Sequence, residues 1–188
     1  MGLFNGLKKE KLIDAEAVKH RDNALLEIVR IVSFNDADTL KYAQDCIDHT
    51  IEYYEKHTVG FEERGISGEE EISFLQWIGC IDLLINNGYV CESDWKEEKD
   101  VFIGQISALR GMNLLSLKID GEWLDGEQSV PEWCEKLDDK WKKSDAAIAA
   151  FDIDSDSYLM FLCKEADMEM LMALAEDFGY RIDHAKNM

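Results

Sequence analysis

Three aspartates at alternate positions are the residues of this chain best placed to do chemistry. They lie in the segment Asp152-Ile-Asp-Ser-Asp156, directly after an apolar run. Alternate carboxylates can converge where a strand runs into a turn, and converging carboxylates bind divalent cations. Asp152, Asp154 and Asp156 are therefore candidate ligands of a weakly held divalent cation. Through that metal they are also candidate residues of a metal-dependent hydrolase.

The same segment has a second interpretation. Read as a calcium loop, it carries Ser157 where a sharp-turn glycine is required and Cys163 where a bidentate glutamate is required. Asp and Ser side chains also accept hydrogen bonds from the backbone of a tight turn. The residues alone leave three uses open, which are a hairpin turn, a loose cation site and a catalytic site.

A second polar segment, residues 92–96, follows an apolar tripeptide that predicts a strand. Asp94 would serve as a general base if it lay in an apolar cleft beside Trp95, because burial raises the pKa of a carboxyl group. Alternatively Asp94 caps a helix, with Glu97 three residues later. The sequence contains no nucleophile elbow, phosphate loop, dinucleotide fingerprint or zinc-protease motif. No catalytic residue is therefore predicted.

The chain is strongly acidic, with 40 Asp and Glu against 20 Lys and Arg and a net charge of -20. Because 46% of its residues are hydrophobic, we expect a folded domain and not a disordered polyanion. Such a surface repels nucleic acid and anionic membranes, and it attracts basic proteins or metal ions. The charge runs are either solvated faces or part of a recognition surface with an aromatic anchor. The candidate partner-binding residues are Glu92, Asp94, Trp95, Trp123 and Trp133.

Cysteine usage and hydropathy set the expected compartment. The five cysteines are odd in number, widely spaced and without a C-x-x-C pair, which indicates reduced thiols in the cytoplasm. The histidines are not grouped, so we expect no structural zinc, and no cofactor beyond a weak divalent cation. No apolar run approaches the roughly 20 residues that span a bilayer. The pattern leaves self-association undetermined.

The order of charges in residues 1–11 is the reverse of a signal peptide, because the lysines follow the apolar residues. We interpret this segment as a mobile tail or a short docked helix, with a membrane-surface foot as the alternative. The length and the absence of a linker predict one domain over residues 1–188.

Periodicity predicts an α+β fold, in which a helical N-terminal half packs with a small, mainly antiparallel sheet and helices of the C-terminal half. In the first half, apolar spacings of three and four predict helices over about 13–32, 36–54, 67–86 and after Asp94, with caps at Asp36 and Ser67. In the second half, alternation of apolar and polar residues predicts a strand at 115–119. Two apolar runs on either side of a polar turn predict a hairpin over 146–153 and 158–163, and a short strand is expected at 180–182. A capping box at Ser129 starts one more helix, and Gly179 ends the last.

Two stretches carry a resemblance: Gly88-Tyr-Val-Cys-Glu-Ser-Asp-Trp-Lys96, and Phe151-Asp-Ile-Asp-Ser-Asp-Ser-Tyr-Leu-Met160 with the helix that follows. Over about residues 70–188 the chain resembles an uncharacterised bacterial family of small acidic cytosolic proteins, a domain of unknown function. The hairpin is also similar to that of SUKH-type immunity proteins, which bind and neutralise toxins. Neither resemblance supplies a catalytic residue. The leading hypothesis is a non-enzymatic acidic protein-binding module of immunity or regulatory type, and the alternative is the metal-dependent hydrolase.

Overall fold

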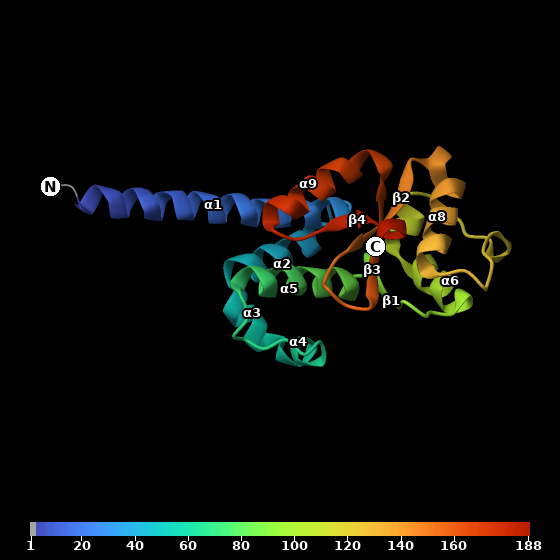
Figure 1. Ribbon diagram of the computed structural model, residues 1–188, viewed down its shortest axis with the longest axis horizontal. Coiled ribbons are helices and arrows are strands. Elements are labelled where there is room, and N and C mark those ends of the chain that lie inside the picture. The colour runs from blue at the N-terminus through green and yellow to red at the C-terminus, as the bar shows by residue number, and fades with distance from the viewer. Residues whose placement is uncertain (1–2) are drawn as a thin grey trace.

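Helices surround a small four-stranded sheet in the computed structural model, which describes residues 3–188, with side chains from Glu16 onward (Figure 1). The helices are α1 (Leu3–Val32), α2 (Ala37–Asp48), α3 (Thr50–Lys56), α4 (Thr58–Glu63), α5 (Ile72–Asn86), α6 (Lys99–Ala108), α7 (Arg110–Leu114), α8 (Val130–Trp141) and α9 (Met168–Phe178). The strands are β1 (Val90–Asp94), β2 (Ala146–Phe151), β3 (Ser157–Lys164) and β4 (Ile182–His184). This arrangement confirms the α+β prediction.

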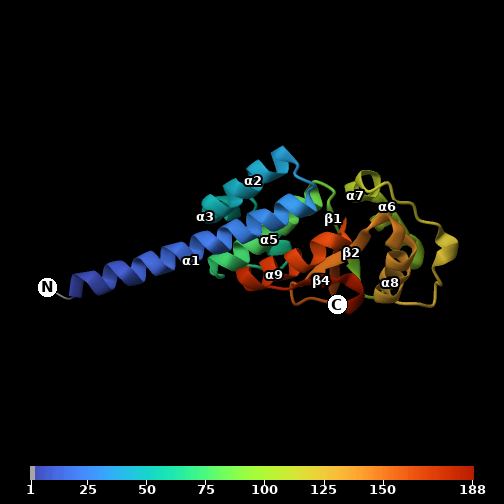
Figure 2. The ribbon, with the colours of Figure 1, turned by 90° about the horizontal axis from the view of Figure 1, so that it is seen from above.

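The sheet is antiparallel throughout, in the order β1-β3-β2-β4. All six residues of β2 are buried, because helices cover both faces of the sheet. Side chains alternate between the two faces of a strand, so Ala147, Ala149 and Phe151 join one core while Ala146, Ile148 and Ala150 join another. Helices α1, α2, α5 and α9 supply the first core, and α6 and α8 supply the second (Figure 2).

Helix α1 packs its C-terminal half against the first core through Leu25, Ile28 and Val32, and its N-terminal half projects from the body (Figure 1). The helix begins at Leu3, well before the predicted start near Ile13. The predictions for residues 1–11 concern side chains that lie outside the described part of the chain. Within that part, no helix combines the length and the apolar composition needed to cross a bilayer.

Local signals placed the ends of several elements correctly. Asp36 caps α2 by accepting the N–H of Thr39 at 2.8 Å. Ser129 and Glu132 form the predicted capping box of α8. Gly179 ends α9 with a φ of 99°, in the left-handed region that favours glycine. The hairpin of β2 and β3 is also confirmed.

Three predicted boundaries are wrong. His49 divides the helix expected over 36–54 into α2 and α3. Ser67 does not cap α5, because its hydroxyl accepts the N–H of Glu69 in a turn and α5 begins only at Ile72. The last strand lies at Ile182–His184, two residues after its predicted start.

Residues 115–119 do not form the expected strand. Ser116 has a φ of 56°, which a regular strand cannot contain. The N–H of Leu117 turns back to the carbonyl of Met112 at 2.8 Å, so the segment closes α7 with a turn. The alternation of apolar residues there reflects single contacts with the second core.

Candidate functional site

The three predicted aspartates lie in or beside the β2–β3 turn. The side chain of one of them, Asp152, accepts a hydrogen bond from the backbone of this turn. Asp152 accepts the N–H of Asp154 through Oδ1 at 3.0 Å, and Asp154 has a left-handed φ of 56°. The other oxygen of Asp152, Oδ2, lies 3.8 Å from Nη1 of Arg181. Among residues 16–188 no group of three or more His, Cys, Asp or Glu side chains is arranged to hold a metal ion. The contacts made here are those of a hairpin turn, and cation binding stays a prediction.

Trp95 lies next to this turn, because β1 pairs with β3 and its last residue, Asp94, faces Ser157. The N–H of Trp95 donates to the carbonyl of Asp156 at 3.2 Å. The residue is 52% exposed, and the ammonium of Lys96 lies 4.3 Å from the ring centroid. A cavity of about 300 Å³, here called the Trp95 cavity, is bordered by Trp95, Asp152, Asp156, Tyr158 and Arg181.

The other predicted contact residues lie elsewhere. Asp94 is exposed and accepts the N–H of Lys96 at 2.8 Å, so it closes a turn. The two roles considered for Asp94 required an apolar cleft or a helix start, and the structure provides neither, because α6 begins at Lys99. Trp123 is half-buried, with the ammonium of Lys140 5.3 Å from its ring centroid.

The expectation that Trp133 is an exposed anchor is wrong. The residue is 1% exposed and its ring centroid lies 5.2 Å from that of Phe102. Its indole N–H donates to the carbonyl of Asp125 at 2.6 Å. Trp133 is on the inner face of α8 with Trp141, and this face packs into the second core.

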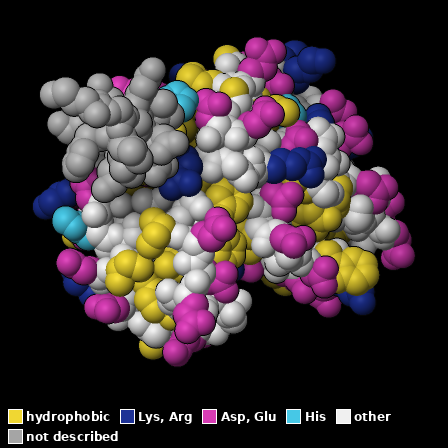
Figure 3. Space-filling view, turned by 60° about the vertical axis from the view of Figure 1, so that its left-hand side comes forward, with side chains coloured by type: hydrophobic (Ala, Val, Ile, Leu, Met, Phe, Trp, Pro, Cys, Tyr) yellow, Lys and Arg dark blue, Asp and Glu magenta, His cyan; other side chains and the backbone are white. Residues whose placement is uncertain are grey.

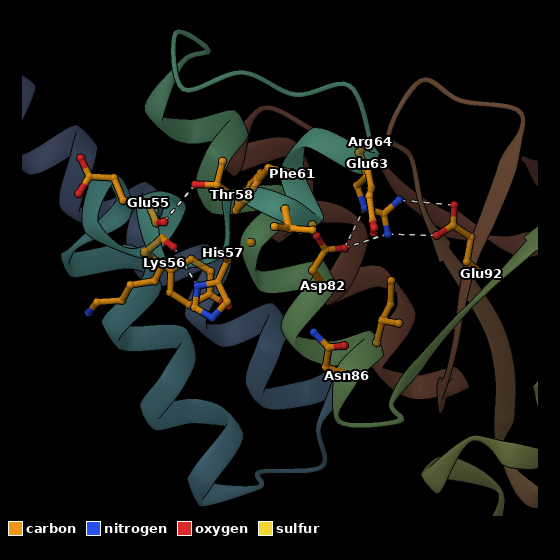
Figure 4. Close-up of a pocket in the computed structure, with 15 residues that line it drawn as sticks. Glu55, Lys56, His57, Thr58, Phe61, Glu63, Arg64, Asp82, Asn86 and Glu92 are labelled. Atoms are coloured by element: carbon orange, nitrogen blue, oxygen red, sulfur yellow. Dashed lines mark hydrogen bonds and ion pairs between the residues drawn. The ribbon is translucent and has the colours of Figure 1, made fainter.

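A larger cavity, which the sequence interpretation missed, lies between the α3–α4 segment and α5 (Figure 4). Its volume is about 640 Å³, within the range usual for small-molecule sites. We call it the Arg64 cavity, and its walls include Tyr53, His57, Arg64, Asp82, Asn86 and Glu92. Gly79 also lines it, at a point where an added Cβ would lie 2.7 Å from Sγ of Cys46. Close packing of α5 at this wall therefore requires glycine.

Arg64 occupies one side of this cavity and joins two carboxylates. Its Nε and Nη2 lie 2.9 and 2.8 Å from Oδ1 of Asp82, and Nη2 lies 3.0 Å from Oε2 of Glu92. Nη1 reaches the second oxygen of Glu92 at 3.4 Å. Burial raises the pKa of Asp82, and the opposing effect of Arg64 is smaller. Arg64 therefore connects the end of α4 with α5 and β1.

His57 lies on the opposite wall from Asp82 and Asn86 (Figure 4). Its ring stacks on Tyr53 with centroids 4.1 Å apart, and its Nδ1 lies 2.8 Å from the carbonyl of Tyr53. A carbonyl only accepts hydrogen bonds, so Nδ1 carries the proton and Nε2 of the neutral ring is an acceptor. Burial raises the pKa of Tyr53, which keeps its hydroxyl protonated at neutral pH.

Two further polar features were not predicted. Asp138 is 9% exposed, and its Oδ1 accepts the N–H of Ile148 on β2 at 2.8 Å. Its Oδ2 lies 3.4 Å from Nζ of Lys186 and 4.0 Å from Nδ1 of His184.

Burial raises the pKa of Cys91 to about 12, which makes this thiol a poor nucleophile at neutral pH.

Comparison with known proteins identifies the family but no closer relative. A search of curated proteins and a search of solved structures each found no match. A family model, described as Domain of unknown function (DUF6630), matches residues 24–185. The match includes both segments that carried the resemblance, the whole lining of the Arg64 cavity and the four strands described. Over most of its length the chain belongs to this DUF6630 family.

Proposed function

We propose that this protein is a non-enzymatic binding module that recognises a basic segment of a partner protein in the cytoplasm. The net charge of -20 supports this function. Asp and Glu side chains are spread over the face shown in Figure 3, with fewer Lys and Arg among them. A field of one sign attracts an oppositely charged partner and speeds its association.

The exposed ring of Trp95 is the observation that carries the proposal. The ammonium of Lys96 already lies on this ring, which is the geometry of a cation–π interaction. The Trp95 cavity adds the side chains of Asp152 and Asp156 beside the ring. A lysine or arginine of a partner would replace Lys96 on the indole and reach these carboxylates. Exposed aromatic residues beside charges are typical of interface hot spots.

This function covers both forms suggested by the sequence. A toxin neutralised by an immunity protein would present such a basic surface, and so would a regulated partner with a basic segment. The five free cysteines agree with a reducing compartment.

Peptide binding tests the proposal. The dissociation constants of Lys/Arg-rich peptides would be measured by calorimetry for the intact protein and for Trp95→Ala. Loss of an interface aromatic typically weakens binding by about 2 kcal/mol, or roughly thirtyfold. The matched control is Tyr42→Ala, because Tyr42 is also an exposed aromatic, at 56%, and is not part of the Trp95 cavity. Equal affinity for both variants would rule out the Trp95 cavity as the contact site.

A further inference from the structure

β1 lies at an edge of the sheet, because in the described part of the chain it pairs with β3 alone. In an antiparallel pair, residues that exchange hydrogen bonds with the partner strand alternate with residues whose N–H and C=O groups point away from it. The N–H of Trp95 donates to the carbonyl of Asp156 at 3.2 Å, on the side of β3. Two residues earlier, Ser93 therefore also bonds β3, and the backbone groups of Glu92 and Asp94 point out of the sheet.

These outward backbone groups are largely without partners. Between residues 16 and 188, the hydrogen bonds of Glu92 outside the sheet all go to its carboxylate, which leaves its N–H and C=O unused. The C=O of Asp94 accepts the N–H of Glu97 at 3.0 Å, while the N–H of Asp94 has no such bond there. Glu92, Asp94 and Trp95 are all exposed. A row of unpaired backbone groups is a template on which another strand can form.

The charges along this edge decide which strand fits it. Glu92 and Asp94 are two residues apart on β1, so their side chains share one face of the sheet. A second copy of the protein, paired antiparallel about Glu92, would bring two Glu92 side chains directly opposite each other, which is destabilising. A basic strand would instead meet two acidic positions.

Neither acidic position is fully neutralised by the protein itself. Arg64 pairs with both Glu92 and Asp82, so this group of three carries one net negative charge. The carboxylate of Asp94 accepts the backbone N–H of Lys96, and among the described residues no Lys or Arg forms an ion pair with it. The edge therefore attracts Lys and Arg side chains, in keeping with the net charge of -20.

We propose that an extended segment of a partner, carrying Lys or Arg at alternate positions, adds to β1 as a fifth strand antiparallel to it. This inference rests on the proposed function and specifies the form in which the basic segment is bound. The affinity would come from main-chain hydrogen bonds with Glu92 and Asp94, and the specificity from the two basic side chains that face them. Because Trp95 directly follows Asp94, the same segment would run past the exposed indole.

Hydrogen exchange in the folded protein, measured by NMR, tests the main-chain contacts. The probe is an acetylated and amidated peptide in which lysine and threonine alternate, so that its lysines share one face. At a peptide concentration of about ten times Kd, exchange of the Glu92 N–H should slow about tenfold by mass action. The N–H of Ser93 is the internal control, because it already bonds β3 and its exchange should change much less.

N-methylated peptides provide a matched pair of ligands with the same charge. The lysine opposite Glu92 directs its own N–H toward β1, and the threonine beside it directs its N–H toward solvent. Methylation of that lysine N–H should weaken binding about tenfold, because one bond is lost and the carbonyl opposite is left unpaired. Methylation of the threonine N–H should leave the affinity nearly unchanged.

The side-chain pattern is tested with a peptide of the same composition whose lysines are consecutive. Only one of two neighbouring lysines can face the carboxylates, so this peptide should bind about threefold more weakly. Asp94→Asn keeps the oxygen that accepts the Lys96 N–H and removes the charge, so it should remove most of this preference. Glu135→Gln removes a charge from an exposed position on α8 and should preserve the preference.

Equal effects of the two N-methyl groups, or an unchanged exchange rate at Glu92, would overturn strand addition. If Trp95→Ala still weakened peptide binding in that case, the basic-segment proposal would stand without it. Failure of every basic peptide to bind would overturn both proposals. Slow exchange at Glu92 in the free protein, together with self-association in sedimentation, would assign this edge to a second copy and refute the inference.

Discussion

Replacing Arg64 by methionine removes a guanidinium that pairs with two carboxylates, while most of the volume of the side-chain stem remains. Arg64 is 21% exposed on its side chain and Asp82 is 23% exposed, so the group lies between a surface ion pair and a buried one. Exposed pairs contribute about 0.2–1 kcal/mol, and breaking a buried pair costs about 3–5 kcal/mol. We therefore expect Arg64→Met to lower the free energy of unfolding by about 2 kcal/mol at neutral pH.

The pH dependence of this loss gives the prediction its sign. The pKa of Asp82 is raised in the folded protein, so its charged form is unfavourable above the ordinary pKa of aspartate. That penalty falls as the pH decreases through the raised pKa. Without Arg64 the pKa of Asp82 rises further, because Glu92 then acts on it uncompensated. The destabilisation by Arg64→Met should therefore be smaller at about pH 5 than at about pH 7.

Urea unfolding followed by tryptophan fluorescence measures this effect at both pH values. A loss of about 2 kcal/mol corresponds to a fall of roughly 4–8 °C in Tm for a protein of this size. Adding Asp82→Asn and Glu92→Gln to Arg64→Met should recover much of the loss, because no buried charge then lacks a partner. Arg30→Met is the control, since Arg30 pairs with Glu27 on α1 at 44% side-chain exposure. A loss for Arg64→Met no larger than for this control, or one independent of pH, would refute the reasoning.

Three more predictions concern the charges of the whole chain. Salt between about 20 and about 300 mM should raise Tm, because the Debye length shrinks several-fold over that range and screens the acidic surface; a constant Tm would mean that the charges are compensated locally. Acidification from about pH 7 to about pH 5.5 should also raise Tm, because burial raises the pKa of both Asp82 and Asp138. Asp36 acts in the opposite direction, because the Thr39 N–H lowers its pKa. The stability that Asp36 contributes is lost only below about pH 4. Millimolar magnesium, manganese or calcium should leave Tm unchanged in calorimetry, and a metal-induced rise that Asp154→Asn abolishes would instead support the hydrolase alternative.

Signals that act over a few residues could be read from the sequence. The cap of Asp36, the box of Ser129 and Glu132, and the glycine at 179 each depend on bonds within one turn, and all three are found as predicted. The turn at 67–70 shows the limit of this approach. Ser67 and Glu70 have the spacing of a capping box, but the residue at the N-cap position of α5 is Glu71. Spacing identifies a nearby turn without deciding which residue starts the helix.

The tryptophans show where a better inference was available. Trp133 and Trp141 lie on the same side of α8, and a stacked aromatic face of an amphipathic helix is usually buried. This spacing already argued against Trp133 as an exposed anchor. Trp95 has no such partners on a helix, and it is the tryptophan that is half exposed.

The Arg64 cavity could not be predicted from local patterns, because its polar contacts join distant parts of the chain. Arg64 contacts Asp82 across 18 residues and Glu92 across 28. In the sequence, Arg64 follows Glu62 and Glu63, which suggests a solvated charge run. Its guanidinium turns inward because the tertiary fold brings the end of α4 close to Asp82 of α5 and Glu92 of β1.

The register of β1 decides toward which side of the sheet Glu92 points. Residues two apart on a strand share a face, so Glu92 lies on the same side as Val90, which packs into the first core with Leu84 and Ile81 of α5. This face lies toward α5, which is how the carboxylate of Glu92 reaches Arg64. β1 pairs with β3 alone, with Glu92 opposite Leu159, so this single ladder holds the register. A shift by one residue would turn Glu92 away from Arg64 and leave the guanidinium with Asp82 only.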